Sequence, residues 1–547
     1  MQYNVNPLDI TLLERYMNRK QADILEELVK EALDKDIRSQ KELQALKNEF
    51  CKRYSISSPT NVSLIKTYRS LVKAGAIQKN HSFLKLIRKR KIRSQSGIAN
   101  ITVLTKGYSC PGNCIFCPTE PEMPKSYLSN EPAMMRAILN DFDAYRQVTN
   151  RLKGLDRTGH PTEKIEIIVA GGTFSYYPKR YQTNFIRGVY NGLNGKKSRS
   201  LAEAQAYNET AKHRCVGLSL ETRPDWINEE EIKRMRMLGA TKVEIGIQSL
   251  DDEILIANKR GHGIDAVKRA MKLLKDAGFK INAHMMPNLY KSSIKKDKKV
   301  FKELFDNQAY RPDWLKIYPC VVTPYSQLEA LYKEGKHIPY NDEELIELMA
   351  SLKKMVPEYV RIARLYRDIP AESIVGGSTL SNLRQYVHQH MAKKGEKCRC
   401  IRCREIKQSI PRPEDVELII REYASSGGKE FFLSYEDVKN DKLISFLRLR
   451  FPSQLYSHKN HFIPALEQTA IVRELHTYGA HLGLHSRRKS AVQHQGYGRR
   501  LLEKAQQLCK QEGVPNLAVI SGIGVREYYR KRGFSRKGTY MSRTIDL

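Results

Sequence analysis

The sequence between about residue 98 and residue 320 alternates short apolar runs with amphipathic helical segments, and this alternation restricts the possible folds most. Strands that are apolar throughout and separated by helices are typical of a parallel sheet covered on both faces. Six such strands, where a closed barrel has eight, predict an α/β fold with a partial parallel barrel. The predicted strands lie at 101–104, 165–170, 216–220, 242–247, 280–286 and 314–318. The predicted helices lie at 132–148, 229–237, 266–277 and 343–355.

Different patterns flank this region, and a chain of 547 residues is too long for one core. Apolar positions three and four apart predict helices from residue 8 to about 75. Predicted antiparallel strands at 431–435, 443–449 and 469–476, with a helix at 497–511 and a strand at 517–520, indicate a C-terminal α+β domain. We therefore expect a helical basic N-terminal module (1–80), the barrel (81–390), a metal-binding linker (391–410) and the α+β domain (411–547).

The chain is strongly basic, with 94 Lys and Arg against 60 Asp and Glu and a net charge of +34. Thirteen of the cations lie between Glu49 and Glu120, where no acidic residue occurs, and six lie at positions 85–93. This zone predicts a nucleic-acid partner, because phosphate contacts depend on charge and not on base sequence. A solvated basic surface is the alternative. No apolar run reaches the roughly 18 residues of a spanning helix, and the N-terminus lacks a secretory pattern. We expect a cytoplasmic protein without a membrane partner.

Six of the ten cysteines fall in two tight clusters, which in a reducing compartment indicates metal ligands. The first cluster, Cys110, Cys114 and Cys117, has the spacing CxxxCxxC and follows the first predicted strand. Three thiolates on one loop can bind three irons of a [4Fe–4S] cluster and leave the fourth iron without a protein ligand. That iron can bind the amino and carboxylate groups of S-adenosylmethionine. A three-thiolate zinc site and a chance spacing are the alternatives.

This loop resembles the signature of the radical S-adenosylmethionine superfamily. Gly171, Gly172 and Thr173 follow the second predicted strand, where that family uses a glycine-rich strand end to contact the methionyl amino group. In barrels, polar residues just past the strand ends form the active site. The residues predicted to bind cofactors in this half of the chain are Gly171, Gly172, Thr173, Glu221, Gln248 and Lys316.

A second cofactor site is predicted near the C-terminus, where a QxxGxG pattern precedes an amphipathic helix. Free backbone N–H groups and the helix dipole at such a start suit a pyrophosphate, and the pattern resembles the coenzyme A loop of the Gcn5-related acetyltransferases. The residues predicted to bind cofactors there are Glu474, Leu475, His476, Gln493, Gln495, Gly496, Tyr497, Gly498, Arg499, Arg500 and Tyr529. Tyr528 and Tyr529 are the predicted catalytic residues, since a phenol can protonate a leaving thiolate. Core packing of both rings is the alternative.

The second cysteine cluster, Cys398, Cys400 and Cys403, lies between the barrel and the α+β domain. Three thiols within six residues predict a structural zinc ion that lacks one of its usual four ligands. His388 and His390 are candidates for the fourth ligand. A second iron–sulfur cluster and unligated thiols are the alternatives.

The combination of the two cofactor loops in one chain resembles the catalytic subunits of Elongator, in their archaeal form. The segments that carry the resemblance include CPGNCIFCPTEPEMPKSYLSNEPAMMRA, GGTFSYYP, LSLETRPD, VEIGIQSL, QHQGYGRRLL and SGIGVREYYRKRGF. The resemblance implies a tRNA-modifying acyltransferase that makes 5-carboxymethyluridine at the wobble uridine. In the implied reaction, a 5′-deoxyadenosyl radical from S-adenosylmethionine takes hydrogen from the methyl group of acetyl-CoA. The carbon radical then adds to C5 of the uridine, and the thioester is hydrolysed.

The implied partners are therefore tRNA and acetyl-CoA, whereas the electron donor and a possible homodimer stay open. A protein lysine acetyltransferase with a non-catalytic radical domain is one alternative, in which Glu474 would serve as the general base. An RNA methylthiotransferase or methyltransferase is another, although that chemistry has no use for the coenzyme A loop.

Overall fold

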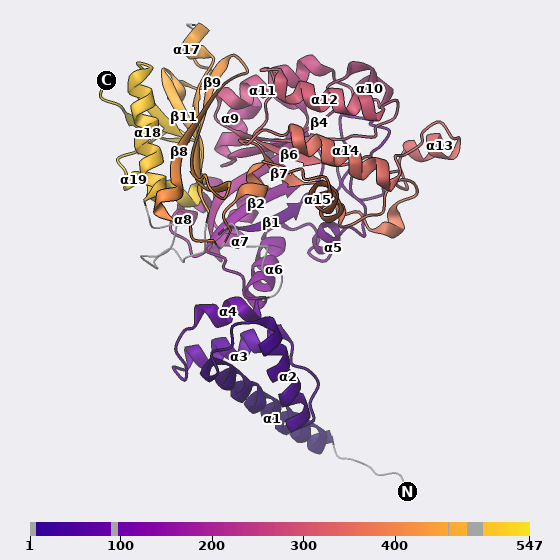
Figure 1. Ribbon diagram of the computed structural model, residues 1–547, viewed down its shortest axis with the longest axis vertical. Coiled ribbons are helices and arrows are strands. Elements are labelled where there is room, and N and C mark those ends of the chain that lie inside the picture. Colours follow the sequence, from indigo (N-terminus) through magenta and orange to yellow (C-terminus); the bar gives the residue numbers. More distant parts are fainter. Residues whose placement is uncertain (1–6, 89–96, 408, 458, 479–495) are drawn as a thin grey trace. The chain divides into compact units, whose positions relative to one another are not determined.

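The computed structural model describes residues 7–88, 97–407, 409–457, 459–478 and 496–547. The chain divides into two compact units (Figure 1). One comprises residues 1–95 with 150–162, and the other comprises residues 96–149 with 163–547. Across the described residues, no helix is long and apolar enough to cross a membrane.

The first unit is a small helical bundle. Its helices are α1 (Pro7–Asp34), α2 (Gln40–Tyr54), α3 (Asn61–Lys73) and α4 (His81–Ile87). Ser39 and Glu42 form a capping box at the start of α2, which satisfies backbone N–H groups there. Apolar residues at helical spacing on all four helices, among them Leu28, Phe50 and Leu64, bury themselves in one core. The predicted helical N-terminal module is present, with α1 as one long helix.

The second unit contains a seven-stranded sheet in which every neighbouring pair is parallel and the strands follow sequence order. Its strands are β1 (Ala99–Leu104), β2 (Lys164–Ala170), β3 (Arg214–Thr222), β4 (Lys242–Gln248), β5 (Lys280–Met285), β6 (Trp314–Ile317) and β7 (Arg361–Arg364). The predicted partial parallel barrel is therefore confirmed. The sequence did not predict β7, because this four-residue strand begins and ends with arginine.

Helices connect these strands or follow the last of them, and Figure 1 shows many of them around the outside of the half-barrel. They are α5 (Pro132–Ile138), α6 (Ala144–Arg157), α7 (Lys179–Asn194), α8 (Leu201–Asn208), α9 (Glu229–Met237), α10 (Asp252–Ala257), α11 (Ile264–Asp276), α12 (Ile294–Asp306), α13 (Leu328–Lys333), α14 (Asp342–Met355), α15 (Leu383–Lys393) and α16 (Ile401–Arg404). The single helix predicted at 132–148 is interrupted, since Asp141 and Phe142 adopt positive φ angles of 49° and 54° between α5 and α6.

A second seven-stranded sheet follows, with the order β13-β14-β12-β11-β10-β9-β8. Its strands are β8 (Val416–Ser425), β9 (Gly428–Asp437), β10 (Lys442–Phe451), β11 (Thr469–Thr477), β12 (Asn516–Val519), β13 (Ser535–Lys537) and β14 (Tyr540–Thr544). The helices of this region are α17 (Gln454–Ser457), α18 (Tyr497–Gln511) and α19 (Arg526–Arg530). All pairs are antiparallel except β11 with β12. The predicted α+β domain and the predicted bounds of its helix at 497–511 agree with the structure.

The two sheets of the second unit pack together through charged residues. On β10, Leu447, Leu449 and Phe451 face α18 in a shared apolar core. The alternating residues Arg448 and Arg450 face the half-barrel and are fully buried. The second sheet is thus covered on both sides, by α18 on one and by the half-barrel on the other (Figure 1).

Eight ionic groups form this contact, and all of them except the partly exposed Glu474 are buried. Arg450 pairs with Asp276 at 2.5 Å and with Glu430 at 3.0 Å. Arg473 bonds Asp313 at 2.5 Å and lies 3.3 Å from Glu430. The remaining members are Lys275, Arg448 and Glu474. Three arginines and Lys275, whose pKa burial lowers to about 7, face four anions. This pairing offsets the desolvation of the charges.

Candidate functional site

The first cysteine cluster lies on the loop after β1, at the carboxyl edge of the parallel sheet. Cys114 is buried, while Cys110 and Cys117 are half-buried. The guanidinium of Arg260 donates to the Cys114 sulfur at 3.2 Å, and that of Arg223 lies 3.9 Å away. A hydrogen bond from Cys117, followed by the charges of Arg260 and Arg223, lowers the pKa of Cys114 to about 4. Thiolates are the form in which cysteines bind metals, so this loop fits a positively charged iron–sulfur cluster.

The glycine pair follows β2 at the same edge. Gly171 has a φ of +129° and Gly172 a φ of +94°, and a Cβ atom on Gly171 would lie 2.1 Å from the Thr105 hydroxyl oxygen. Only glycine fits this backbone, so a ligand can approach it closely. Thr173 places its hydroxyl oxygen 3.5 Å from the Cys110 sulfur. The structure thus brings the predicted glycine-rich strand end to the first cysteine cluster.

Polar side chains from neighbouring strands line the sheet beside this edge. The Glu221 carboxylate accepts from the Gly171 N–H at 3.3 Å and from the Tyr127 hydroxyl at 2.9 Å. His284 lies 2.9 Å from Glu244 and 3.9 Å from Glu221. Lys316 forms an ion pair with Glu244. Glu221 and Lys316, predicted from sequence, therefore belong to one network across β3, β4, β5 and β6.

Electrostatics fixes the charges of this network. Burial acts to raise the pKa of Glu244, but the charge of Lys316 and the hydrogen bond from His284 hold it well below its usual range. Burial and the nearby Lys316 lower the pKa of His284, so this imidazole is neutral at physiological pH. Gln248, at the end of β4, has a φ of +71° beside a β-bulge. Strain of this kind in a side-chain-bearing residue is typical of functional sites.

The strand that precedes the predicted coenzyme A loop, β11, pairs with β10 through a β-bulge. Arg448 pairs with Glu474 and Leu449 with Val472, so Arg473 is an extra residue on β11. The bulge turns both Arg473 and Glu474 toward the half-barrel, where Glu474 bonds Arg448 at 2.9 Å. Leu475 and Thr477 then face α18, because both side chains lie within reach of Gly498.

The start of α18 completes this second site. Gly496 caps the helix with a φ of +77°, and its free N–H groups and dipole favour an anion. A Cβ atom on Gly498 would lie 3.2 Å from the Tyr528 hydroxyl, 3.7 Å from the Thr477 hydroxyl and 4.0 Å from Leu475. Two other segments, β11 and α19, thus converge on the first turn of α18.

The two predicted catalytic tyrosines have different surroundings. Tyr529 packs in the core against Phe534. Tyr528 points its hydroxyl at Gly498, and the Arg532 guanidinium lies 3.5 Å from its ring centre. Burial raises the pKa of Tyr528, with Arg532 opposing the shift, so the phenol is protonated at neutral pH. Of the two hydroxyls, that of Tyr528 is therefore the one directed at the first turn of α18.

The other predicted residues of this region surround the turn. Tyr497 is buried against Tyr435, and the Arg500 guanidinium lies over both rings. Arg499 is exposed and pairs with Glu503 at 3.5 Å. His476 packs beside Tyr478, away from Gly498. Gln493 and Gln495 lie outside the described residues, as do Lys89 to Arg93 of the basic zone.

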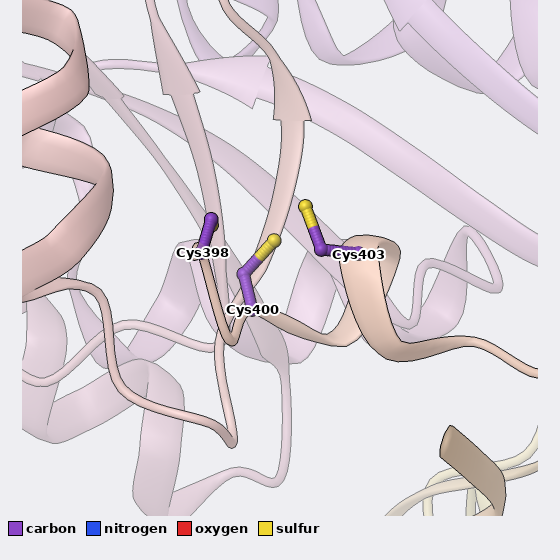
Figure 2. A group of neighbouring side chains, drawn as sticks. All are labelled: Cys398, Cys400 and Cys403. Atoms are coloured by element: carbon purple, nitrogen blue, oxygen red, sulfur yellow. The ribbon is translucent and has the colours of Figure 1, made fainter. Parts of the chain in front are cut away.

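The second cysteine cluster forms a compact ligand group (Figure 2). The sulfur atoms of Cys398, Cys400 and Cys403 all lie within 4.8 Å of one another, a spacing suited to one metal ion. The Nε2 atoms of both candidate histidines contact other side chains, so neither histidine offers this atom to the cluster. His388 Nε2 contacts Lys353 at 3.0 Å, and His390 Nε2 contacts Glu347 at 2.7 Å.

Sequence reasoning missed three residues of the first site. They are Tyr127, Glu244 and Arg260. Glu244 carries a recognisable signal, because a charged residue in the otherwise apolar run KVEIGI needs a buried partner. Tyr127 and Arg260 lie in loops, where no periodicity places a side chain.

Comparison with known proteins agrees with this geometry. Residues 104–300 match the radical SAM superfamily, and residues 312–393 match the Radical_SAM C-terminal domain. The tRNA uridine(34) acetyltransferase of Methanocaldococcus infernus is 43% identical over 95% of this chain and 98% of its own. Elongator complex protein 3 of Dictyostelium discoideum is 39% identical over 92% of this chain and 91% of its own. The solved structure of M. infernus Elp3 with an N-terminal deletion (1–46) covers 82% of this chain and 99% of that chain, at 44% identity and a TM-score of 0.73.

A parallel half-barrel that carries a three-cysteine loop and a glycine pair at its carboxyl edge defines a radical S-adenosylmethionine enzyme, and this superfamily implies a [4Fe–4S] cluster. The chain belongs to the family of tRNA uridine(34) acetyltransferases and Elongator complex protein 3.

Proposed function

We propose that the protein converts the wobble uridine of tRNA to 5-carboxymethyluridine with acetyl-CoA and S-adenosylmethionine. The observation that supports this most is the joining of two cofactor sites in one compact unit. Asp313 immediately precedes β6, which carries Lys316 of the radical site. Its partner Arg473 lies two residues before Leu475 of the acetyl-CoA site. A buried ion pair thus fixes the two sites relative to each other.

The residues of the half-barrel hold and orient the first cofactor. When bound, the cluster and S-adenosylmethionine supply a 5′-deoxyadenosyl radical. Cys110, Cys114 and Cys117 would hold the iron, while Arg260 compensates the thiolate charge. Gly171 and Gly172 leave room for the methionyl group. The network of Glu221, Glu244, His284 and Lys316 offers fixed polar groups at the strand edge to a bound substrate.

The first turn of α18 would hold acetyl-CoA. Its N–H groups would bind the pyrophosphate, and Leu475 and Thr477 at the edge of β11 would contact the thioester arm. Tyr528 keeps a proton on its phenol oxygen and can donate it to the leaving thiolate. Glu474 is bonded to Arg448 and lies 3.4 Å from the Trp314 indole nitrogen. These contacts argue against a free general base and hence against a lysine acetyltransferase.

The proposal includes two further ligands. Zinc would bind at Cys398, Cys400 and Cys403, and tRNA would bind at the basic surface. A compact group of three thiols between the two sheets suits a structural ion. In the first unit, Lys52, Lys66, Lys73 and Lys79 are exposed, and exposed cations of this kind bind the RNA backbone. Such an enzyme acts in the cytoplasm, where tRNA is available.

Mass spectrometry of tRNA nucleosides tests this proposal. Anaerobic protein with S-adenosylmethionine, acetyl-CoA, a reductant and tRNA should form 5-carboxymethyluridine, and omission of either cofactor should prevent it. Gly498→Val should lower product formation at least tenfold, because the added side chain meets the Tyr528 hydroxyl and the space beside the first turn.

Gly154→Ala is the matched control, since nothing lies within 4 Å of a Cβ atom at that position. Its product yield should equal that of the unaltered protein. If the Gly498→Val protein forms product at the full rate, acetyl-CoA does not bind at the first turn of α18.

A further inference from the structure

An aromatic cluster at the rim of the radical site has no part in the chemistry described above. Three tyrosine rings stack in order. Tyr108 lies 4.9 Å from Tyr177 with an interplanar angle of 29°, and Tyr177 lies 5.1 Å from Tyr181 with an angle of 22°. Tyr176 adds a fourth ring 5.9 Å from Tyr108 and contacts Trp226 edge-on at 4.9 Å.

The inner rings of this stack are fixed, whereas the outer ring is open. The Tyr177 hydroxyl donates to the Lys106 carbonyl at 2.7 Å, and the Tyr181 hydroxyl accepts from the Lys106 N–H at 3.2 Å. Tyr177 is only 4% exposed, but Tyr108 is 41% exposed. Tyr108 is therefore a rigidly supported ring with an accessible surface, which costs little entropy to use in binding.

The position of the stack links it to the reaction. Tyr108 lies two residues before Cys110, and Tyr176 lies three residues after Thr173. Cys110 and Thr173 contact each other in the radical site. Trp226 lies three residues after Arg223, which follows β3 and faces Cys114. The rings therefore lie at the carboxyl edge of the sheet, where a substrate must enter.

The charge around the stack indicates the chemical class of its partner. Lys106 places its ammonium 5.5 Å from the Tyr181 ring, and Lys179 and Arg180 are exposed at the start of α7. Aromatic rings among cations are the pattern of single-stranded nucleic-acid sites, in which bases stack on the rings and phosphates contact the cations. An apolar peptide would not use the cations.

We propose that Tyr108 stacks against the RNA base next to the target uridine. This inference rests on the proposed function. A uridine that reacts at a buried site must leave the base stack of its loop, which leaves the neighbouring base without a partner. Tyr108 replaces that partner at the rim and holds the loop in register while the uridine enters.

Fluorescence of 2-aminopurine tests this stacking. The probe is placed next to the wobble uridine in an anticodon stem-loop, which is added to full-length protein loaded with its metals. The unaltered protein should quench the probe. Tyr108→Ala should abolish the quenching and weaken stem-loop binding about tenfold, while Tyr108→Phe retains both because it keeps the ring.

Tyr456→Ala is the matched control, since Tyr456 is 46% exposed and lies on α17 outside the ring cluster. It should quench and bind like the unaltered protein. Persistent quenching by Tyr108→Ala would overturn the proposal. Weaker S-adenosylmethionine binding with unchanged RNA affinity would also overturn it, because the ring would then hold the cofactor. Failure of the unaltered protein to form modified uridine contradicts the proposed function instead.

Discussion

Replacement of Cys114 by alanine is expected to remove the iron–sulfur cluster and all modified uridine. Two thiolates of the loop cannot hold three irons, and the buried Arg260 and Arg223 lose the sulfur that they face. Iron content and the brown absorbance should fall to background, and 5-carboxymethyluridine should be undetectable by mass spectrometry.

Cys400→Ala separates this effect from a general loss of metal. Cys400 is as buried as Cys114 but belongs to the compact second cluster. Cys400→Ala should lose zinc and keep iron, whereas Cys114→Ala should keep zinc and lose iron. Modified uridine in the Cys114→Ala protein would contradict the assignment of the radical site.

Glu430→Gln is expected to lower the free energy of unfolding of the second unit by about 3–5 kcal/mol, the usual cost of breaking a buried ion pair. Glu430 is fully buried and faces three basic side chains, at 3.0 Å from Arg450, 3.3 Å from Arg473 and 3.8 Å from Lys275. The amide leaves these side chains without enough negative charge. The midpoint of urea unfolding measures the loss.

A surface pair provides the comparison. Asp306 bonds Lys302 at 2.7 Å on α12, with both side chains more than half exposed. Water and salt screen such a pair, so Asp306→Ala should leave the midpoint unchanged. If Glu430→Gln shifts the midpoint no more than Asp306→Ala does, the buried charges do not hold the two sheets together.

The sequence predicts the sheets well because their signals are local. Apolar runs separated by helices indicate the half-barrel, and cysteine spacing indicates both ligand clusters. The contact between the sheets has no such signal. In the run FLRLRF of β10, alternation predicts an apolar and a polar face, and a polar face ordinarily meets water. Here Arg448 lies 3.6 Å from Asp313 of the half-barrel and Arg450 pairs with Asp276 of the half-barrel, which only the tertiary structure reveals.

Side-chain direction is the other property that sequence reasoning cannot supply. A regular strand would place Val472 and Glu474 on one face. The bulge at Arg473 leaves Val472 in the core beside α18 and turns Glu474 toward the half-barrel. Sequence alone likewise cannot distinguish two adjacent tyrosines. In the structure, a short helix buries Tyr529 in the core and directs Tyr528 toward Gly498.

The most direct test of the coupled reaction follows deuterium from acetyl-CoA. The protein is supplied with acetyl-CoA deuterated on its methyl group, S-adenosylmethionine, a reductant and tRNA, and the 5′-deoxyadenosine is weighed by mass spectrometry. Simple acyl transfer breaks no methyl C–H bond, whereas the proposed reaction breaks one. We expect deuterium in the 5′-deoxyadenosine together with modified tRNA. Modified tRNA alongside unlabelled 5′-deoxyadenosine would contradict the account.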